Sequence, residues 1–284
     1  MFKRALQVLV VGIAACLLVP FAGAAAAPAD VVCSQDTEFF TGTARNLIVA
    51  EDHFCFVLDA KITNDLIVSD RGFALILNST IGRDLVANGD AGAEVGAGTT
   101  VGQDLVLKGP GGGLHLEQMT IGRDLVASQP GTVQTGKNGP DTPGGPVNVG
   151  RDVVIDGSPD FAFVFDGLCD LHVARDLRIT NRSVTLGMGI GNICAPNGLP
   201  SNTIGRDLIM TGNHALDGFF GPSALIVGDN EVGRDLVFTG NTAVPGGALL
   251  VSGNDAVRDV TCASNSPAAI ALAPNTAGRA NTCG

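Results

Sequence analysis

Ile121-Gly122-Arg123-Asp124-Leu125 is one of nine copies of a short phrase that reads apolar residue, usually Gly and Arg, then Asp, then Leu or Val. A tenth, weaker copy is Ala44-Arg45-Asn46-Leu47-Ile48-Val49. The phrase recurs every 19 to 31 residues, which predicts a stack of equivalent units, because one unit alone cannot bury its apolar face. The nine copies carry Asp65, Asp84, Asp104, Asp124, Asp152, Asp176, Asp207, Asp235 and Asp259.

The segment 224–241 shows what one unit contains. Two short apolar runs are separated by Gly228, Asp229 and Asn230, residue types that favour turns, and no apolar stripe has the period of a helix. The shortest spacing, 19 residues, is enough for one small coil of two or three strands. We therefore predict an all-β fold, a single-stranded parallel β-solenoid of about ten coils, and a right-handed winding because parallel crossovers nearly always have that hand.

Stacked coils place equivalent residues about 4.8 Å apart, so like residues form columns. We expect two inward columns, with the phrase Gly between them at a corner whose backbone conformation a Cβ would obstruct. The first column is Ile81, Val101, Ile121, Val149, Ile204 and Val232, and the second is Leu85, Leu105, Leu125, Leu177, Leu208 and Leu236.

The nine phrase aspartates are predicted to form a structural corner ladder. Like charges one coil apart repel by about 1 kcal/mol in water, but an Arg precedes most of these aspartates and neutralises the column. We expect the carboxylates to accept backbone N–H groups, with each Arg in solvent or bridging to the next coil. A calcium column is the alternative, but Gly- and Asp-rich calcium repeats have nine-residue spacing.

The N-terminus indicates export. Lys3 and Arg4 precede an apolar stretch and then small residues at 23–27, so residues 1–27 are predicted to be a helical signal peptide and residues 28–284 the solenoid domain. Lipidation at Cys16 and an uncleaved membrane anchor are the alternatives. Loss of Lys3 and Arg4 takes the formal net charge from −11 to −13, and such an acidic domain is not expected to bind nucleic acid.

An even number of cysteines in an exported domain favours disulfides. Fifteen pairings are possible, and pairing of sequence neighbours joins residues 21 to 25 positions apart, close to one repeat. Two of these pairs would staple the ends of the stack, where strand edges are unpaired. The predicted pairs are Cys33 with Cys55, Cys169 with Cys194, and Cys262 with Cys283.

An outward apolar stripe follows the phrase. Either a flat β face simply favours Val, or the stripe is covered by the chain's own loops or by lateral self-association. The stripe comprises Ile67, Val86, Val106, Val126, Val154, Ile209 and Val237. Beyond Asp124 the repeats lengthen, and loops on one face are usual binding sites. The candidate ligand residues there are His214, Asp217, Phe219 and Phe220.

No catalytic constellation is evident. The four histidines are not arranged with metal-ligand spacing, and Asp166 and Asp170 are interpreted as loop charges. We therefore predict no enzyme activity, no cofactor and no metal.

The coil periodicity over residues 45–265, together with the Ile-Gly-Arg-Asp-Leu phrase, resembles secreted parallel β-helix proteins. That architecture includes pectate-lyase-like polysaccharide enzymes, adhesins and polymer-forming bactofilins, so the resemblance implies a fold and not an activity. We expect an exported bacterial scaffold, released or bound to the cell wall, whose partner is a cell-envelope component or glycan. A polysaccharide-active or polysaccharide-binding protein and a self-assembling filament unit are the alternatives.

Overall fold

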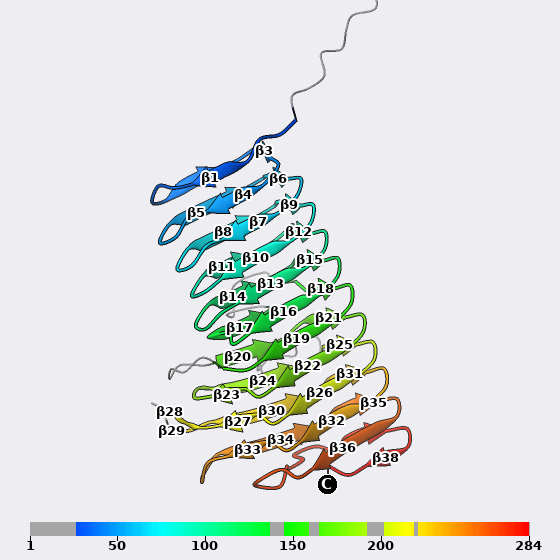
Figure 1. Cartoon of the computed structure of the whole chain (residues 1–284). Helices are drawn as coiled ribbons and strands as arrows, with labels where there is room; N and C mark the ends of the chain where they lie inside the picture. Colours follow the sequence, from blue (N-terminus) through cyan, green and yellow to red (C-terminus); the bar gives the residue numbers. More distant parts are fainter. Residues whose placement is uncertain (1–26, 137–144, 159–164, 192–201, 219–220, 284) are drawn as a thin grey trace, which may run out of the picture.

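The computed structural model describes residues 27–136, 145–158, 165–191, 202–218 and 221–283, and within these ranges every regular element is a β-strand. The strands stack into three long parallel sheets that form the sides of a rod (Figure 1). The chain therefore has the predicted parallel β-solenoid architecture. Its hand and the number of ten coils stay predictions.

The twelve-stranded sheet, called sheet A, contains β1 (Val31–Cys33), β4 (Leu47–Val49), β7 (Leu66–Val68), β10 (Leu85–Asn88), β13 (Leu105–Lys108), β16 (Leu125–Ser128), β19 (Val153–Asp156), β22 (Leu177–Thr180), β26 (Leu208–Thr211), β32 (Leu236–Thr239), β36 (Asp259–Ala263) and β38 (Ala280–Asn281). The ten-stranded sheet B contains β2 (Glu38–Phe40), β5 (Phe54–Leu58), β8 (Phe73–Leu77), β11 (Gly92–Val95), β14 (Gly113–Leu116), β17 (Thr132–Thr135), β20 (Phe165–Leu168), β24 (Gly187–Gly191), β30 (Ala224–Gly228) and β34 (Ala248–Ser252). The eleven-stranded sheet C contains β3 (Thr43–Ala44), β6 (Lys61–Ile62), β9 (Thr80–Ile81), β12 (Thr100–Val101), β15 (Thr120–Ile121), β18 (Val147–Val149), β21 (Leu171–Val173), β25 (Thr203–Ile204), β31 (Glu231–Val232), β35 (Asp255–Ala256) and β37 (Thr276–Ala277).

Two smaller sheets accompany the lengthened repeats. Sheet D contains β23 (Ser183–Val184), β27 (His214–Ala215) and β33 (Thr242–Ala243), and a hairpin pairs β28 (Asp217–Gly218) with β29 (Gly221–Pro222). The extra residues of the long repeats lie in connections that enter or leave sheet B. The corner between sheets C and A has the same length in all nine phrases and is one residue shorter at Arg45-Asn46.

The repeat positions stack in register and form the core. Leu85 pairs with Leu105 and Leu105 with Leu125, while Val101 pairs with Ile81 and Ile121. Every member of the two predicted inward columns is at most 2% exposed. The alternation of strands and corners that fixes this register is already visible in the sequence, which is why the columns could be predicted.

The phrase glycines are explained by close stacking and not by a special backbone conformation, which corrects the sequence interpretation. None of the glycines at positions 82, 102, 122, 150, 205 and 233 has a positive φ. A Cβ at Gly122, however, would lie 2.2 Å from the carbonyl oxygen of Gly102 in the preceding coil. Thr63, Ala174 and Val257 occupy the equivalent position, so three coils accommodate a side chain there.

Asparagine columns fill two inner corners of the C-terminal half. The Asn202 side-chain amide donates to Oδ1 of Asn230 at 3.0 Å and to the Leu168 carbonyl at 2.8 Å, and the same pattern continues down the column. Because buried amides are costly unless bonded, the ladder is stable only when adjacent coils also supply Asn. One column is Asn202, Asn230, Asn254 and Asn275, and the other is Asn213, Asn241 and Asn265.

Arg182 and Asp166 form an ion pair whose side chains are both 0% exposed. Arg182 donates to both Asp166 carboxylate oxygens, at 2.9 and 3.0 Å, and to the carbonyls of Pro130 and Gly157. The Arg182 amide donates to Asn213, so this residue also begins an asparagine column. Asp166 stacks on Val133 in a core position, and burial raises its pKa. The interpretation of Asp166 as a loop charge was wrong. Asp170 does lie in a connection, between β20 and β21, where its φ is positive and its side chain is buried.

Disulfides join neighbouring coils at both ends of the described rod. Cys33 is bonded to Cys55, with Cα atoms 6.1 Å apart, and Cys262 is bonded to Cys283, with Cα atoms 4.9 Å apart. Two of the three predicted pairings are thus confirmed. The third involves Cys194, which lies outside the described residues and stays a prediction.

The predicted leader, with Cys16, falls almost wholly in residues 1–26, outside the described part of the chain. In the part that is described, no helix has the length and apolar character needed to cross a bilayer.

We expect Arg182→Met to destabilise the fold by about 3 to 5 kcal/mol, because it leaves a carboxylate buried without its partner. Adding Asp166→Leu should recover part of the loss. Arg83→Met is the control, since this Arg is 52% exposed and its pair should contribute about 1 kcal/mol at most. Denaturant midpoints measure all three, and equal losses for Arg182→Met and Arg83→Met would contradict the prediction.

Candidate functional site

The phrase aspartates lie in one column at the corner between sheets C and A. In each step, Oδ1 of one Asp accepts the backbone N–H of the Asp in the next coil, as at Asp104 and Asp124, where the distance is 3.1 Å. The same contact recurs at 3.0 to 3.2 Å between all nine residues, from Asp65 to Asp259. The carboxylate therefore replaces a backbone acceptor at the corner.

Each phrase Arg reaches back to the Asp of the preceding coil. Nε of Arg123 lies 3.6 Å from Oδ1 of Asp104, and Arg234 and Arg279 make closer contacts with Asp207 and Asp259. The same relation holds for Arg83, Arg151, Arg175, Arg206 and Arg258, at 3.6 to 3.7 Å. Every phrase Asp except Asp84 thus pairs with the Arg of the following coil, so these charged groups hold neighbouring coils together.

The ladder is longer than the phrase indicates. Asp30 occupies the position above Asn46, and Asn46 accepts the Asp65 amide at 3.2 Å. A hydrogen bond from Arg45 lowers the pKa of Asp30 to about 2. At the other end, Ala280 replaces the Asp, and Arg279 keeps the phrase Arg. The sequence signals were Ala29-Asp30-Val31 and Gly278-Arg279-Ala280, which match only part of the phrase.

Two of the nine phrases lack the Arg, which is replaced by Asn64 and by Gln103. Gln103 lies between two phrases that keep it, those of Arg83 and Arg123. Asp84, in the preceding coil, accepts the Asp104 amide at 3.0 Å, and the guanidinium of Arg83 lies 3.9 Å from its other oxygen. The backbone of Gln103 follows the ladder, since its N–H donates to the Arg83 carbonyl at 2.8 Å. A substitution at position 103 therefore measures how much one Arg–Asp pair of the ladder contributes to stability.

The outer face of sheet B carries an aromatic patch near its N-terminal end. Phe39 and Phe56 stack with ring centroids 4.5 Å apart, and Phe54 and Phe73 stack at 5.2 Å. Phe54 also meets Phe56 edge to face at 4.6 Å. Phe39 is 64% exposed. Aromatic surface that faces water is a common feature of interaction sites.

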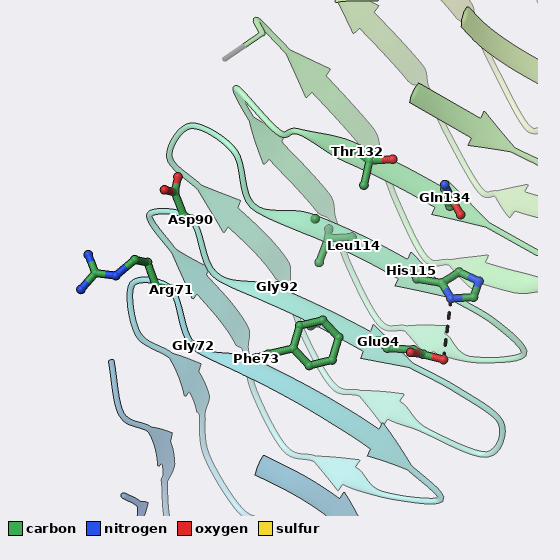
Figure 2. A pocket seen from close by; sticks show the side chains of 12 residues that line it. Arg71, Gly72, Phe73, Asp90, Gly92, Glu94, Leu114, His115, Thr132 and Gln134 are labelled. Atoms are coloured by element: carbon green, nitrogen blue, oxygen red, sulfur yellow. Dashed lines mark ion pairs between the residues drawn. The ribbon is translucent and has the colours of Figure 1, made fainter. Parts of the chain in front are cut away.

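A hollow adjoins this patch on the next strands of sheet B. Figure 2 shows its floor near Gly92, with the Phe73 ring against it and Arg71 and Asp90 at the bend on one side. On the other side, Oε1 of Glu94 lies 3.8 Å from Nδ1 of His115. The hollow exists because glycines 92 and 113 follow two phenylalanines in the same column. Its polar rim and apolar floor are typical of a binding surface.

The structure describes two of the four predicted loop residues, so a site among them stays a prediction. His214 lies in β27, where its Nδ1 is 2.6 Å from the Thr242 hydroxyl, and so it belongs to a ladder in sheet D. Asp217 is exposed in the β28 hairpin, and Phe219 and Phe220 lie outside the described residues. The hollow on sheet B was missed, because its phenylalanines and glycines become neighbours only when the register of the coils is known.

The predicted outward stripe lies on sheet A. Its members are partly exposed and alternate with fully buried residues, and Arg178 interrupts it between Val154 and Ile209. The described residues contain no group of three metal-ligating side chains that could hold a metal ion. Comparison with family models, curated proteins and solved structures found no match for this chain.

Gln103→Arg should stabilise the protein by about 0.2 to 1 kcal/mol, because it supplies the cation that Asp84 lacks from the next coil. Arg123→Gln, the reverse change one coil later, should cost a similar amount. Urea midpoints of both variants test the ladder. Two changes of the same sign would show that the Arg side chains do not act through the Asp column.

Stability should fall in acid below about pH 3.8. A hydrogen bond from Arg279 lowers the pKa of Asp259, and hydrogen bonds from Arg178 and the Asp207 amide outweigh burial and lower that of Asp176. At these two carboxylates the native state therefore binds fewer protons than the unfolded chain, so their stabilisation is complete above the ordinary pKa of 3.8 and is lost as pH falls through the lowered values.

Urea midpoints between pH 7 and pH 2.5 would measure this loss. Arg279→Gln should flatten the acid limb, because Asp259 then titrates closer to its ordinary pKa. Lys108→Gln removes the same charge from another position of sheet A and should leave the limb unchanged. An equal effect of both variants would assign the acid loss to net charge.

Proposed function

We propose that this protein is an exported, non-enzymatic structural rod that acts as a scaffold at or outside the cell surface. The observation that carries the proposal is the use of its repeated charged groups. The phrase Asp and Arg residues bind each other and the backbone across coils, and so they serve the rod and not a reacting molecule. Fold alone gives no activity, so this use of the side chains is the functional argument.

Export is supported by two independent features. The disulfides Cys33–Cys55 and Cys262–Cys283 persist in oxidising compartments, and residues 1–27 have the charge and apolar pattern of a signal peptide. The partner is a cell-envelope component or glycan, since the acidic surface disfavours nucleic acid. Contact with a membrane is through the leader, with lipidation at Cys16 as the alternative route.

The test separates export from activity. N-terminal sequencing of the protein recovered outside the cytoplasm should place the new N-terminus near residues 24–28, and thiol labelling should find no free cysteine in it. Purified protein should then leave acidic polysaccharides intact, with and without calcium. Turnover that is abolished by changing surface carboxylates would overturn the scaffold in favour of a polysaccharide-active enzyme. A reduced chain with the intact leader, retained in the cytoplasm, would overturn export.

A further inference from the structure

Valine and isoleucine form an outward column along sheet A. Val106 in β13, Val126 in β16 and Val154 in β19 occupy the same position on successive coils, and each is partly exposed between buried residues. From β4 to β32, Arg178 is the one interruption of this column, whose other members are Ile48, Ile67, Val86, Val106, Val126, Val154, Ile209 and Val237. Association would bury such a continuous apolar strip on an open sheet.

The next outward column carries a cation and a carboxylate that are not paired with each other. Lys108, Ser128 and Asp156 follow one another on β13, β16 and β19, and all three are exposed. The ammonium group of Lys108 has no hydrogen-bonding or ionic partner in the described part of the chain. Asp156 accepts hydrogen bonds from the Thr180 hydroxyl and, at 3.1 Å, from the Asn181 amide. Its carboxylate can still accept a charged donor.

These two charges lie symmetrically about β16. Lys108 is one coil before Ser128, and Asp156 is one coil after it. From β10 to β32, the other members of this column are uncharged, namely Asn88, Ser128, Thr180, Thr211 and Thr239. A twofold axis along β16 reverses the order of the coils but keeps each position along a strand. It therefore places Lys108 of each copy opposite Asp156 of the other.

The same axis places apolar residues opposite apolar residues. Val126 faces its own copy, and the further pairs are Val106 with Val154, Ile67 with Ile209, and Ile48 with Val237. Val86 faces Arg178. Because the Arg178 guanidinium binds Asp176 of its own strand region at 2.9 Å, the methylene stem of Arg178 is the part that meets Val86.

We propose that two copies of this chain pack face to face through sheet A as an antiparallel dimer centred on Val126. Sheets that pack in this way lie about 10 Å apart, and an extended Lys side chain opposite an Asp spans that separation. The contact runs from β4 to β32, about 40 Å at the strand spacing, and across about 13 Å of each strand. It buries about 1,000 Å² in the two copies together, the lower limit for a specific interface, so the dimer should dissociate on dilution.

Charge reversal tests the facing pair. Lys108→Asp places two carboxylates at each contact and Asp156→Lys places two ammonium groups there, so each variant should weaken the dimer by about tenfold or more. Sedimentation of the concentrated wild-type protein should give twice the chain mass. Lys61→Asp in β6 and Asp255→Lys in β35 make the same charge changes on the outer face of sheet C, and they should leave association unchanged.

Mixing the two variants identifies the register. A heterodimer of the Lys108→Asp chain with the Asp156→Lys chain has an Asp–Lys pair at both contacts, so the mixture should associate like the wild type although neither variant does so alone. Native mass spectrometry distinguishes this heterodimer from both homodimers. Both variants keep an acidic net charge, so attraction between net charges does not account for the rescue.

Thermal melts of the diluted variants separate association from folding. Lys108 has no partner within the single chain, so Lys108→Asp should leave the melting temperature of the separated chains unchanged. The melt of Asp156→Lys verifies that this variant is folded.

Three outcomes would overturn the dimer. They are a wild-type protein that stays monomeric at high concentration, a dimer that neither variant weakens, and folded variants that fail to associate when mixed. The inference deepens the proposed scaffold role and rests on it. Its failure is distinguishable, because an exported and inactive monomer would still be a structural rod.

Discussion

The hydrogen bonds between successive coils impose the constraint on which the whole structure depends. Parallel stacking places every side chain about 4.8 Å from its equivalent, so any residue type used once in the repeat is multiplied into a column. Apolar columns are stabilised by this stacking, because their side chains bury one another, as at Leu105. A column of Asp alone would be destabilised by repulsion between like charges. The phrase meets the constraint by making each carboxylate an acceptor for the next amide and by pairing it with the Arg of the next coil, as Asp104 pairs with Arg123.

The same constraint explains where the residues that fill the inner corners of the coils change. The coils before Asp166 fill their inner corners with small or apolar residues, and the coils after Arg182 fill them with Asn. The first Asn of each column accepts a backbone N–H of the coil above, from Leu171 at Asn202 and from Arg182 at Asn213. The guanidinium of Arg182 also binds Asp166 and two carbonyls of earlier coils. The buried pair thus joins two kinds of coil at one defined register, the role for which buried charges are best attested.

The features that repeat in every coil could be predicted from the sequence, whereas the features that occur once could not. Nine phrases gave the sheets, the inward columns and the position of the Asp ladder, because each expectation was supported by many copies. Asp166 had no repeat to identify it and looked like a loop charge. The asparagines were visible in principle, since Asn202 and Asn230 each stand two residues before the apolar residue of a phrase. The hollow beside Phe73 required the register itself, as its residues lie about 20 positions apart.

Differences between the three faces follow from how freely each can vary. The corner between sheets C and A is fixed by the charged ladder, so its length is the same in all nine phrases, and the insertions occur in the connections of sheet B. The outward residues of sheet B also change along the rod, from the ring of Phe73 to Gly92 and Gly113. A residue type that repeats in every coil makes all coils look alike to a partner. A column whose residues vary makes one coil different from the next. Specific recognition by a solenoid therefore belongs to its least regular columns.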